Sequence, residues 1–408
     1  MKIIIIGAGP AGVSVVETIR GHDQRSEILM VSAEPSPPYS PPAMADHFIH
    51  GSNAHLWRGQ DWPENQGVDY QSGVTIKGVE PDDHLVRLTD GKKITYDRLV
   101  IATGSRLYAP VDGADLPGVY NFKSLSAAQT LIDQVKRGEA QKAMIVGAGF
   151  IGMEIALLLR TLGVAVTQVE KTEQVMPGML DGDTAELALK FMQDRGIEVR
   201  LQTKVVAFIG DDRAEGVKLE SGESLDADVM VAATGVRPNL EFLEDSGVNH
   251  DWGITVDEYL HTNLEDVYAA GDVVEVPDLL TGETYVHAIF PNAVEQGNVV
   301  GLNLLGFDTR YEGAHRMNSL KHLDLPIMAA GLKTGDEMLQ TRKYGNLRTI
   351  YLMDNQVVGF QLVGDIQTAG VLRALMNNHQ NIGGIKDRLL DPSFGQGTIA
   401  WEAIAPWV

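Results

Sequence analysis

The sequence predicts an α/β protein, and three repeated features of the chain carry this prediction. A short apolar run leads into the pattern Gly-x-Gly-x-x-Gly at residues 7–12, and the same combination recurs 140 residues later at 147–152. Each pattern is followed by a helical stretch and then by a second apolar run that ends in an acid, Glu34 or Glu170. A later apolar run in each half ends in Ala-Thr-Gly. We therefore predict two Rossmann-like nucleotide-binding domains, followed by a C-terminal α+β domain.

The three glycines of each pattern have separate physical roles. The first permits the tight turn from strand to helix, the second admits a pyrophosphate against bare backbone, and the third lets the helix pack closely on the strand. The pyrophosphate then lies at a helix N-terminus, which favours anions, and the distal acid accepts the hydroxyl protons of a ribose. An isolated glycine pattern is weak evidence, but both copies here have their strand, helix and acid. The residues expected at the two nucleotides are Gly7, Gly9, Pro10, Ala11, Gly12 and Glu34 in the first half, and Gly147, Gly149, Ile151, Gly152 and Glu170 in the second.

The length and charge of the chain restrict the classes of function. With 408 residues the chain is long enough for two or three domains. Its formal charge of −22 disfavours nucleic acid and anionic membrane surfaces as partners, because both are polyanionic. Met1 and Lys2 lead directly into the first apolar run, which leaves no room for a signal peptide or a spanning helix, so we expect a cytoplasmic protein.

The chain contains no cysteine. Disulfides, thiolate nucleophiles and cysteine ligands for zinc or iron–sulfur clusters are therefore excluded. His47, His50 and His55 form a local group of histidines, but no matching acidic pattern accompanies them. We interpret them as loop residues, so no metal site is predicted.

The repeated features divide the first part of the chain into two similar units. The first unit closes with an apolar strand over residues 96–104. The second starts near residue 109, has a helix over 124–138 before its glycine pattern, and closes with a strand over 227–235. The repetition of the same features in the same order indicates an internal duplication.

Two further segments follow the duplicated units. Residues 263–305 carry Tyr-Ala-Ala-Gly-Asp, ending at Asp272, and a helical stretch that starts near Asn292. From about residue 310 the pattern changes to short alternating strands and a helix, which indicates a separate α+β domain. The elements expected in this tail are strands at 347–353 and 356–363 and a helix at 368–377, and Trp401 and Trp407 near its end are expected to be buried.

With both glycine patterns, both Ala-Thr-Gly ends and Tyr-Ala-Ala-Gly-Asp272 in this order, the chain resembles the FAD-dependent pyridine nucleotide-disulfide oxidoreductase superfamily. The resemblance covers about residues 1–305, and the tail resembles more weakly the C-terminal interface domain of that superfamily. It implies an FAD-binding domain over 1–108 and 236–309, an NAD-binding domain over 109–235 and an interface domain over 310–408.

The resemblance also assigns the cofactors. It implies that the first glycine pattern and Glu34 hold the ADP half of FAD, and that Asp272 hydrogen-bonds the ribityl chain of FAD. It implies that the second pattern and Glu170 hold NAD(H), with Glu170 favouring NADH because a carboxylate repels the 2′-phosphate of NADPH. Lys171 lies next to this acid. Further residues implied at FAD or at the crossovers between the nucleotide domains are Ala102, Thr103, Gly104, Gly235 and Gly271.

Glu154 is the predicted catalytic residue. It lies two residues after Gly152, where members of the superfamily with Gly-x-Gly-x-x-Gly-x-Glu place a glutamate beside the nicotinamide. The alternative is an acid in the first turn of a helix, which the helix dipole favours without any role in catalysis.

The chain departs from the superfamily at the loop that carries the redox cysteine in related enzymes. NADH peroxidases and CoA-disulfide reductases have a cysteine where this chain has Pro42, so thiol chemistry is excluded. Dioxygenase ferredoxin reductases have a lysine near the flavin where this chain has Asp46. In the tail, residues 318–321, 324–326 and 362–365 look like flavin segments of assimilatory nitrite reductases and rubredoxin reductases.

These observations predict an FAD-containing oxidoreductase that exchanges hydride with NADH and passes electrons singly to a redox protein. The partner would be rubredoxin, ferredoxin or the iron–sulfur subunit of a larger complex, as electron acceptor or, with reversed flow, as donor. The alternatives are a peroxide-forming NADH oxidase and a structural subunit that binds FAD for stability only. A homodimer or a place in a hetero-oligomeric complex is also expected.

Overall fold

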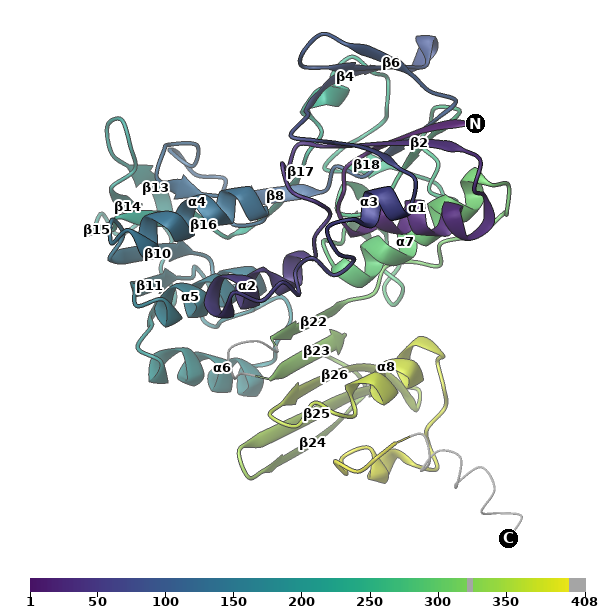
Figure 1. The fold of residues 1–408 in the computed structure, drawn as a ribbon. Helices are drawn as coiled ribbons and strands as arrows, with labels where there is room; N and C mark the ends of the chain where they lie inside the picture. The colour runs from purple at the N-terminus through teal and green to yellow at the C-terminus, as the bar shows by residue number, and fades with distance from the viewer. Residues whose placement is uncertain (321–325, 396–408) are drawn as a thin grey trace. The chain divides into compact units, whose positions relative to one another are not determined.

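The computed structural model describes residues 1–320 and 326–395, which group into two compact units built from segments far apart in the sequence (Figure 1). Lys321, Asp324, Leu325, Trp401 and Trp407, which the sequence singled out, lie outside the described residues. Unit 1 contains Met1–Pro110, Val119–Glu139 and Gly235–Ala314, and unit 2 contains Val111–Gly118, Ala140–Thr234 and the chain from His315 onward. Each unit has a parallel sheet with helices, which confirms the predicted fold class.

The sheet of unit 1 has the strand order β19-β7-β1-β2-β3, and all neighbouring strands are parallel. Its central strand β1 (Lys2–Ile6) is a run of isoleucines that are fully or almost fully buried, as expected for a parallel strand covered on both faces. The other strands are β2 (Glu27–Ser32), β3 (Asp69–Ser72), β7 (Arg98–Ile101) and β19 (Val267–Ala269).

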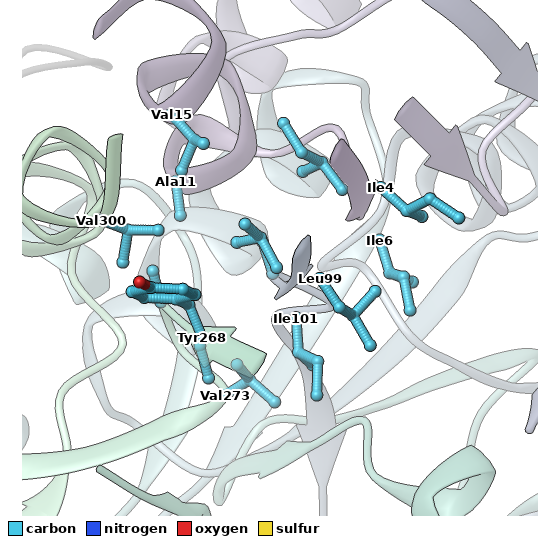
Figure 2. Close-up of a cluster of buried hydrophobic side chains, with 14 of the residues drawn as sticks. Ile4, Ile6, Ala11, Val15, Leu99, Ile101, Tyr268, Val273 and Val300 are labelled. Carbon is cyan, nitrogen blue, oxygen red and sulfur yellow. The ribbon is translucent and has the colours of Figure 1, made fainter. Parts of the chain in front are cut away.

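Two helices pack together in the core of unit 1. Helix α1 (Pro10–His22) follows the first glycine turn, and α7 (Phe290–Leu304) contacts it closely, because a Cβ atom at Gly297 would lie 2.4 Å from the carbonyl oxygen of Ala11. Figure 2 shows part of this core, with side chains from α1, α7 and the sheet. The residues labelled there are Ile4, Ile6, Ala11, Val15, Leu99, Ile101, Tyr268, Val273 and Val300, all of them buried.

Smaller elements complete unit 1. Its antiparallel groups are β4-β5-β6, the pair β8 and β17, and β20-β21, with β18 parallel to β20. The strands are β4 (Ile76–Glu80), β5 (Leu85–Leu88), β6 (Lys93–Thr95), β8 (Ser105–Tyr108), β9 (Val119–Tyr120), β17 (Gly235–Pro238), β18 (Ile254–Thr255), β20 (Val274–Pro277) and β21 (Thr284–Val286). The helices are α2 (Met44–His50), α3 (Trp62–Asn65) and α4 (Leu125–Lys136), with 3₁₀ turns at Pro41–Ala43, Pro81–Asp83 and Glu241–Leu243.

Unit 2 repeats the nucleotide-binding arrangement. The strand β10 (Lys142–Val146) lies between β11 (Ala165–Val169) and β16 (Val229–Ala232), and β12 (Glu198–Arg200) pairs with β11, all in parallel. Helix α5 (Phe150–Thr161) follows the second glycine turn. The remaining elements of this part are α6 (Gly182–Asp194) and the antiparallel strands β13 (Val205–Ile209), β14 (Gly216–Leu219) and β15 (Ser224–Asp226).

The C-terminal part of unit 2 is an antiparallel sheet with the order β22-β23-β26-β25-β24 and a helix, α8 (Ala369–Asn377). The observed β25 (Asn346–Met353), β26 (Gln356–Val363) and α8 agree with the predicted elements to within one residue. The other elements are β22 (Met317–Leu320), β23 (Ile327–Gly331), β24 (Glu337–Lys343) and a 3₁₀ turn at Lys386–Arg388.

Helix α6 connects the two parts of unit 2. Asp181 caps this helix by accepting the N–H of Thr184 at 2.8 Å, and its other carboxylate oxygen accepts the hydroxyl of Tyr351 at 2.5 Å. The N–H of Asp181 donates to the side chain of Gln361 at 3.0 Å. Unit 2 therefore contains both the C-terminal sheet and the second nucleotide-binding sheet, and the finer division into three domains stays a prediction.

Within the part of the chain that the structure describes, every helix is too short or too polar to cross a lipid bilayer.

Candidate functional site

Both glycine turns have the geometry that the sequence predicts. Gly7 has a φ of +115° and Gly147 a φ of +106°, a backbone region that favours glycine. A Cβ atom at Gly7 would lie 2.0 Å from the carbonyl oxygen of Ala102, and one at Gly147 would lie 2.4 Å from that of Ala233. Each first glycine is therefore pressed against the end of the strand that carries Ala-Thr-Gly, and a larger residue would not fit.

The second glycine of each turn faces open space. A Cβ atom at Gly9 or at Gly149 would have no atom within 4 Å outside its immediate chain neighbours. Gly9 and Gly149 are also the N-caps of α1 and α5, and neither helix start has a side-chain cap. Bare backbone at an uncapped helix start suits a pyrophosphate, so the residues present fit the nucleotides that the sequence implies.

The third glycines keep each helix against its turn. A Cβ atom at Gly12 would lie 2.1 Å from the carbonyl oxygen of Gly7, and one at Gly152 would lie 2.4 Å from that of Gly147. Pro10 and Ala11 occupy the first turn of α1, and Ile151 occupies the first turn of α5. The structure thus brings the residues of each predicted glycine pattern together in one turn.

Glu34 lies at the start of helix α4, within unit 1. Its carboxylate accepts the N–H of Ser126 at 3.0 Å and the hydroxyl of Ser126 at 2.6 Å. The hydroxyl of Tyr39 lies 3.5 Å from the same carboxylate and accepts the N–H of Leu125 at 2.9 Å. Burial, together with the nearby Glu34 carboxylate, raises the pKa of Tyr39, so its phenol stays neutral.

The bonds of Glu34 and Tyr39 to the start of α4 lie within unit 1, which contains Val119–Glu139. The sequence placed residues 119–139 in the second domain instead.

Asp272 is held close to the first glycine turn. Gly271, just before it, packs on α1, since a Cβ atom there would lie 3.1 Å from that of Ala11. The carboxylate of Asp272 accepts the hydroxyl of Ser105 at 2.9 Å and forms an ion pair with Lys123. The side chains of Asp272 and Lys123 are only 16% and 18% exposed, so the pair is largely shielded from water.

The Thr103–Gly104 crossover is fixed by Asn239. The hydroxyl of Thr103 donates to the carbonyl of Asn239, and the Asn239 side chain donates to the carbonyl of Thr103, both at 2.9 Å. Just beyond it, β8 and β17 form an antiparallel pair in which Gly235 lies opposite Tyr108.

Glu170 is buried, at 7% exposure, and its carboxylate is already bonded within the protein. One oxygen accepts the N–H of Ala148 at 2.9 Å, and the other accepts the N–H and the hydroxyl of Thr172, both at 3.0 Å.

Glu170 does not occupy the same position relative to its strand as Glu34. The N–H groups of the first glycines bond to the carbonyls of Val31 and Val169, so Glu170 follows its strand partner by one residue and Glu34 by three.

Glu154 is half-buried in α5 and forms no hydrogen bond or ion pair with the described residues. Burial raises the pKa of Glu154 to about 7. The first turn of α5 contains no acid, because Glu154 lies beyond it. The alternative hypothesis, that Glu154 is an acid in the first turn of a helix, is therefore wrong.

The sequence placed His47, His50 and His55 in a loop, but His47 and His50 lie in the last turn of α2, and only His55 lies outside a helix or strand. Among the described residues, no group of three or more histidines and acids could hold a metal ion. The Nδ1 atoms of His47 and His55 lie 2.9 Å and 3.3 Å from the carbonyl oxygen of Ser52, and their rings pack at 4.0 Å.

Sequence reasoning missed several residues that the fold brings to these sites. Lys123 and Ser105 are separated from Asp272 by 149 and 167 residues, and Ser126 from Glu34 by 92, so no local spacing could reveal them. The missed residues are Ser105, Lys123 and Ser126.

The chain belongs to the pyridine nucleotide-disulphide oxidoreductase family, whose model matches residues 1–297. This confirms the resemblance that the sequence indicated.

Three relatives are similar along most of their length. An NADH oxidase of Methanocaldococcus jannaschii is 30% identical, with 92% of this chain and 90% of the relative covered. The epsilon subunit of the NADH-dependent phenylglyoxylate dehydrogenase of Aromatoleum evansii is 29% identical, with 95% and 94% covered. The ferredoxin reductase component of the chlorobenzene dioxygenase of Cupriavidus sp. is 30% identical, with 86% and 89% covered.

Proposed function

We propose that the protein is an FAD-containing oxidoreductase that exchanges hydride with NAD(H) and passes electrons singly to a redox protein. The observation that carries this proposal is the pair of glycine turns with the same geometry, both open at the second glycine, in a chain without cysteine. Two such turns suit a transfer between two nucleotides, and the lack of cysteine excludes a thiol relay.

The residues of unit 1 are assigned to FAD. The turn at Gly7, Gly9 and Gly12 would hold the pyrophosphate, Glu34 the adenosine ribose and Asp272 the ribityl chain. When bound, FAD supplies the redox chemistry, since it accepts a hydride equivalent and can release electrons one at a time. The ion pair with Lys123 and the bond from Ser105 fix the orientation of the Asp272 carboxylate before the cofactor binds.

The residues of unit 2 are assigned to NAD(H). The turn at Gly147, Gly149 and Gly152 would hold the pyrophosphate, and Glu170 would face the adenosine ribose and disfavour NADPH. Glu154 would lie beside the nicotinamide. A carboxyl group with a pKa of about 7 is present there in both protonation states near neutral pH, so it can supply a negative charge to the oxidised ring.

A redox protein such as ferredoxin or rubredoxin is the proposed electron partner, and the similarity to a ferredoxin reductase component supports this choice. The similarity to an NADH oxidase supports a second candidate, in which oxygen accepts the electrons. The similarity to a dehydrogenase subunit supports a permanent place in a larger complex, in which electrons could also flow towards NAD⁺.

Stopped-flow reoxidation of the FAD-loaded protein separates these candidates. After reduction by NADH, we expect slow reoxidation in air-saturated buffer and rapid reoxidation when a ferredoxin or rubredoxin is added. Rapid reoxidation by oxygen alone would establish the oxidase instead. If NADH does not bleach the flavin at all, the protein binds FAD for structural reasons only.

We further propose a cytoplasmic protein that forms either a homodimer or a subunit of a hetero-oligomeric complex. Size-exclusion chromatography of the purified chain and co-purification from the native host test this point, since a bound iron–sulfur subunit would identify both the partner and the assembly.

A further inference from the structure

One peptide group of the second glycine turn is held at both ends by side chains of the neighbouring strand. The carbonyl of Gly147 accepts the side-chain N–H of Gln168 at 3.0 Å. The N–H of Ala148, at the other end of the same peptide bond, donates to the carboxylate of Glu170 at 2.9 Å. Gln168 and Glu170 are two residues apart along an extended strand, so both side chains point to the same side.

In the first turn, no described side chain is bonded to the corresponding peptide group in this way. Gly7 and Gly147 bond to the carbonyls of Val31 and Val169, so Met30 is the register equivalent of Gln168, and Ser32 that of Glu170. The thioether of Met30 has no N–H to donate. The hydroxyl of Ser32 accepts the N–H of Glu34 at 3.2 Å rather than contacting the turn. The two turns share their glycines but differ in how the peptide after the first glycine is fixed.

Packing alone does not explain a glutamine at this position. Gln168 is fully buried, and its Oε1 atom has no hydrogen-bond partner among the described residues. A buried, unpartnered amide oxygen destabilises a fold, and Met30 shows that an apolar side chain fits the equivalent position. The remaining gain from Gln168 is its bond to the turn.

We propose that Gln168 is a positioning residue that pre-organises the second turn for a nucleotide that must bind and leave in every catalytic cycle. FAD stays bound between turnovers, so its turn needs no such aid, whereas each NADH molecule would otherwise order the turn anew. Fixing the Gly147–Ala148 peptide in advance removes that ordering cost from NADH binding. This inference rests on the proposed assignment of NADH to the second turn.

The replacement Gln168→Met tests the inference, because it copies the residue of the first turn. We expect the KM and the dissociation constant for NADH to rise about five- to tenfold, as for the loss of one buried hydrogen bond. The kcat at saturating NADH and the FAD content should stay unchanged. Thr167→Val is the control. It removes a side-chain hydrogen bond to Glu198 from the residue of β11 that precedes Gln168, and this bond does not reach the glycine turn. An NADH affinity within twofold of wild type in Gln168→Met would overturn the inference.

A second variant separates this inference from the proposed function. Gly149→Val should abolish flavin reduction by NADH if the second turn binds NADH. If this variant reduces its flavin normally, the assignment of NADH fails. If it is inactive while Gln168→Met binds NADH normally, only the role of Gln168 fails.

Hydrogen exchange of the wild-type protein tests whether the second turn is ordered before NADH binds, which the proposed role of Gln168 requires. The Ala148 amide should exchange slowly in the NADH-free holoenzyme, and NADH should add little further protection. Fast exchange that stops only when NADH is added would show that the turn is not pre-organised.

Discussion

At the scale of a single residue, the proposed position of Glu154 beside the nicotinamide predicts a pH dependence. Nicotinamide becomes positively charged when NADH gives up its hydride, so an ionised carboxyl beside it stabilises the product side of the step. Because the pKa of Glu154 is about 7, we expect the rate of flavin reduction by NADH to rise as the pH passes through about 7. Stopped-flow reduction across this range measures it, and Glu154→Gln should lose the transition. A Gln variant with the wild-type pH profile would contradict the role of Glu154.

The same pKa affects stability in the opposite direction. The carboxyl of Glu154 has a pKa of about 7 in the folded protein against 4.5 as its ordinary value, so the folded state binds this proton more tightly. Stability from this group is therefore fully present below about pH 4.5 and is lost as the pH rises through about 7. We expect Glu154→Gln to raise the Tm at about pH 8 and to leave it nearly unchanged at about pH 5. Thermal unfolding at both values checks the sign.

Lys123 tests the shielded ion pair with Asp272. Lys123→Met leaves a mostly buried carboxylate with Ser105 as its remaining bond among the described residues, so we expect a loss of about 1–3 kcal/mol in the free energy of unfolding. Chemical denaturation measures the loss. Lys92→Met is a suitable control, since the pair of Lys92 with Asp90 is exposed and should contribute less than about 1 kcal/mol. Equal effects in the two variants would refute the shielding argument.

At the scale of elements, the start of α4 is bonded to a predicted FAD residue. Ser126 gives Glu34 one bond from its backbone N–H and one from its hydroxyl. Ser126→Ala keeps the first bond and removes the second, so the carboxylate should become less well fixed and the dissociation constant for FAD should rise by about two- to fivefold. Thr130→Val, one turn further along α4, removes a bond that does not reach Glu34 and serves as control. Fluorescence titration of the apoprotein with FAD gives both constants. Unchanged FAD affinity in Ser126→Ala would separate α4 from the cofactor site.

The elements were predictable where short-range patterns determine them. The isoleucine run of β1, the glycine turns and the strands β25 and β26 follow from burial, backbone geometry and alternation within a few residues. The partners of Asp272 and Glu34 were not predictable, because they come from segments more than 90 residues away. The difference between Glu34 and Glu170 was also hidden, since both acids follow apolar strands and only the strand register separates them.

The charge of −22 acts at the scale of the whole molecule. Such an excess of acids repels itself most strongly in the compact state, and dissolved ions screen this repulsion. We therefore expect the Tm to rise by a few degrees when the salt concentration increases from about 10 mM to about 150 mM. Differential scanning calorimetry of the holoenzyme measures this shift, with a neutral osmolyte series as control. A Tm that falls with salt would show that attractive ion pairs outweigh the net repulsion.

The contact between Glu170 and the Ala148 amide has a consequence for coenzyme engineering. Under the proposed assignment of NADH to the second turn, a route to an NADPH-using variant is to replace Glu170 by a neutral residue and to add a cation nearby. In this protein that replacement also removes one of the two side-chain hydrogen bonds to the Gly147–Ala148 peptide group. The N–H of Ala148 is then left without its acceptor. A successful coenzyme switch would therefore need a third change that gives the Ala148 amide a new acceptor, in addition to the two changes that alter the charge.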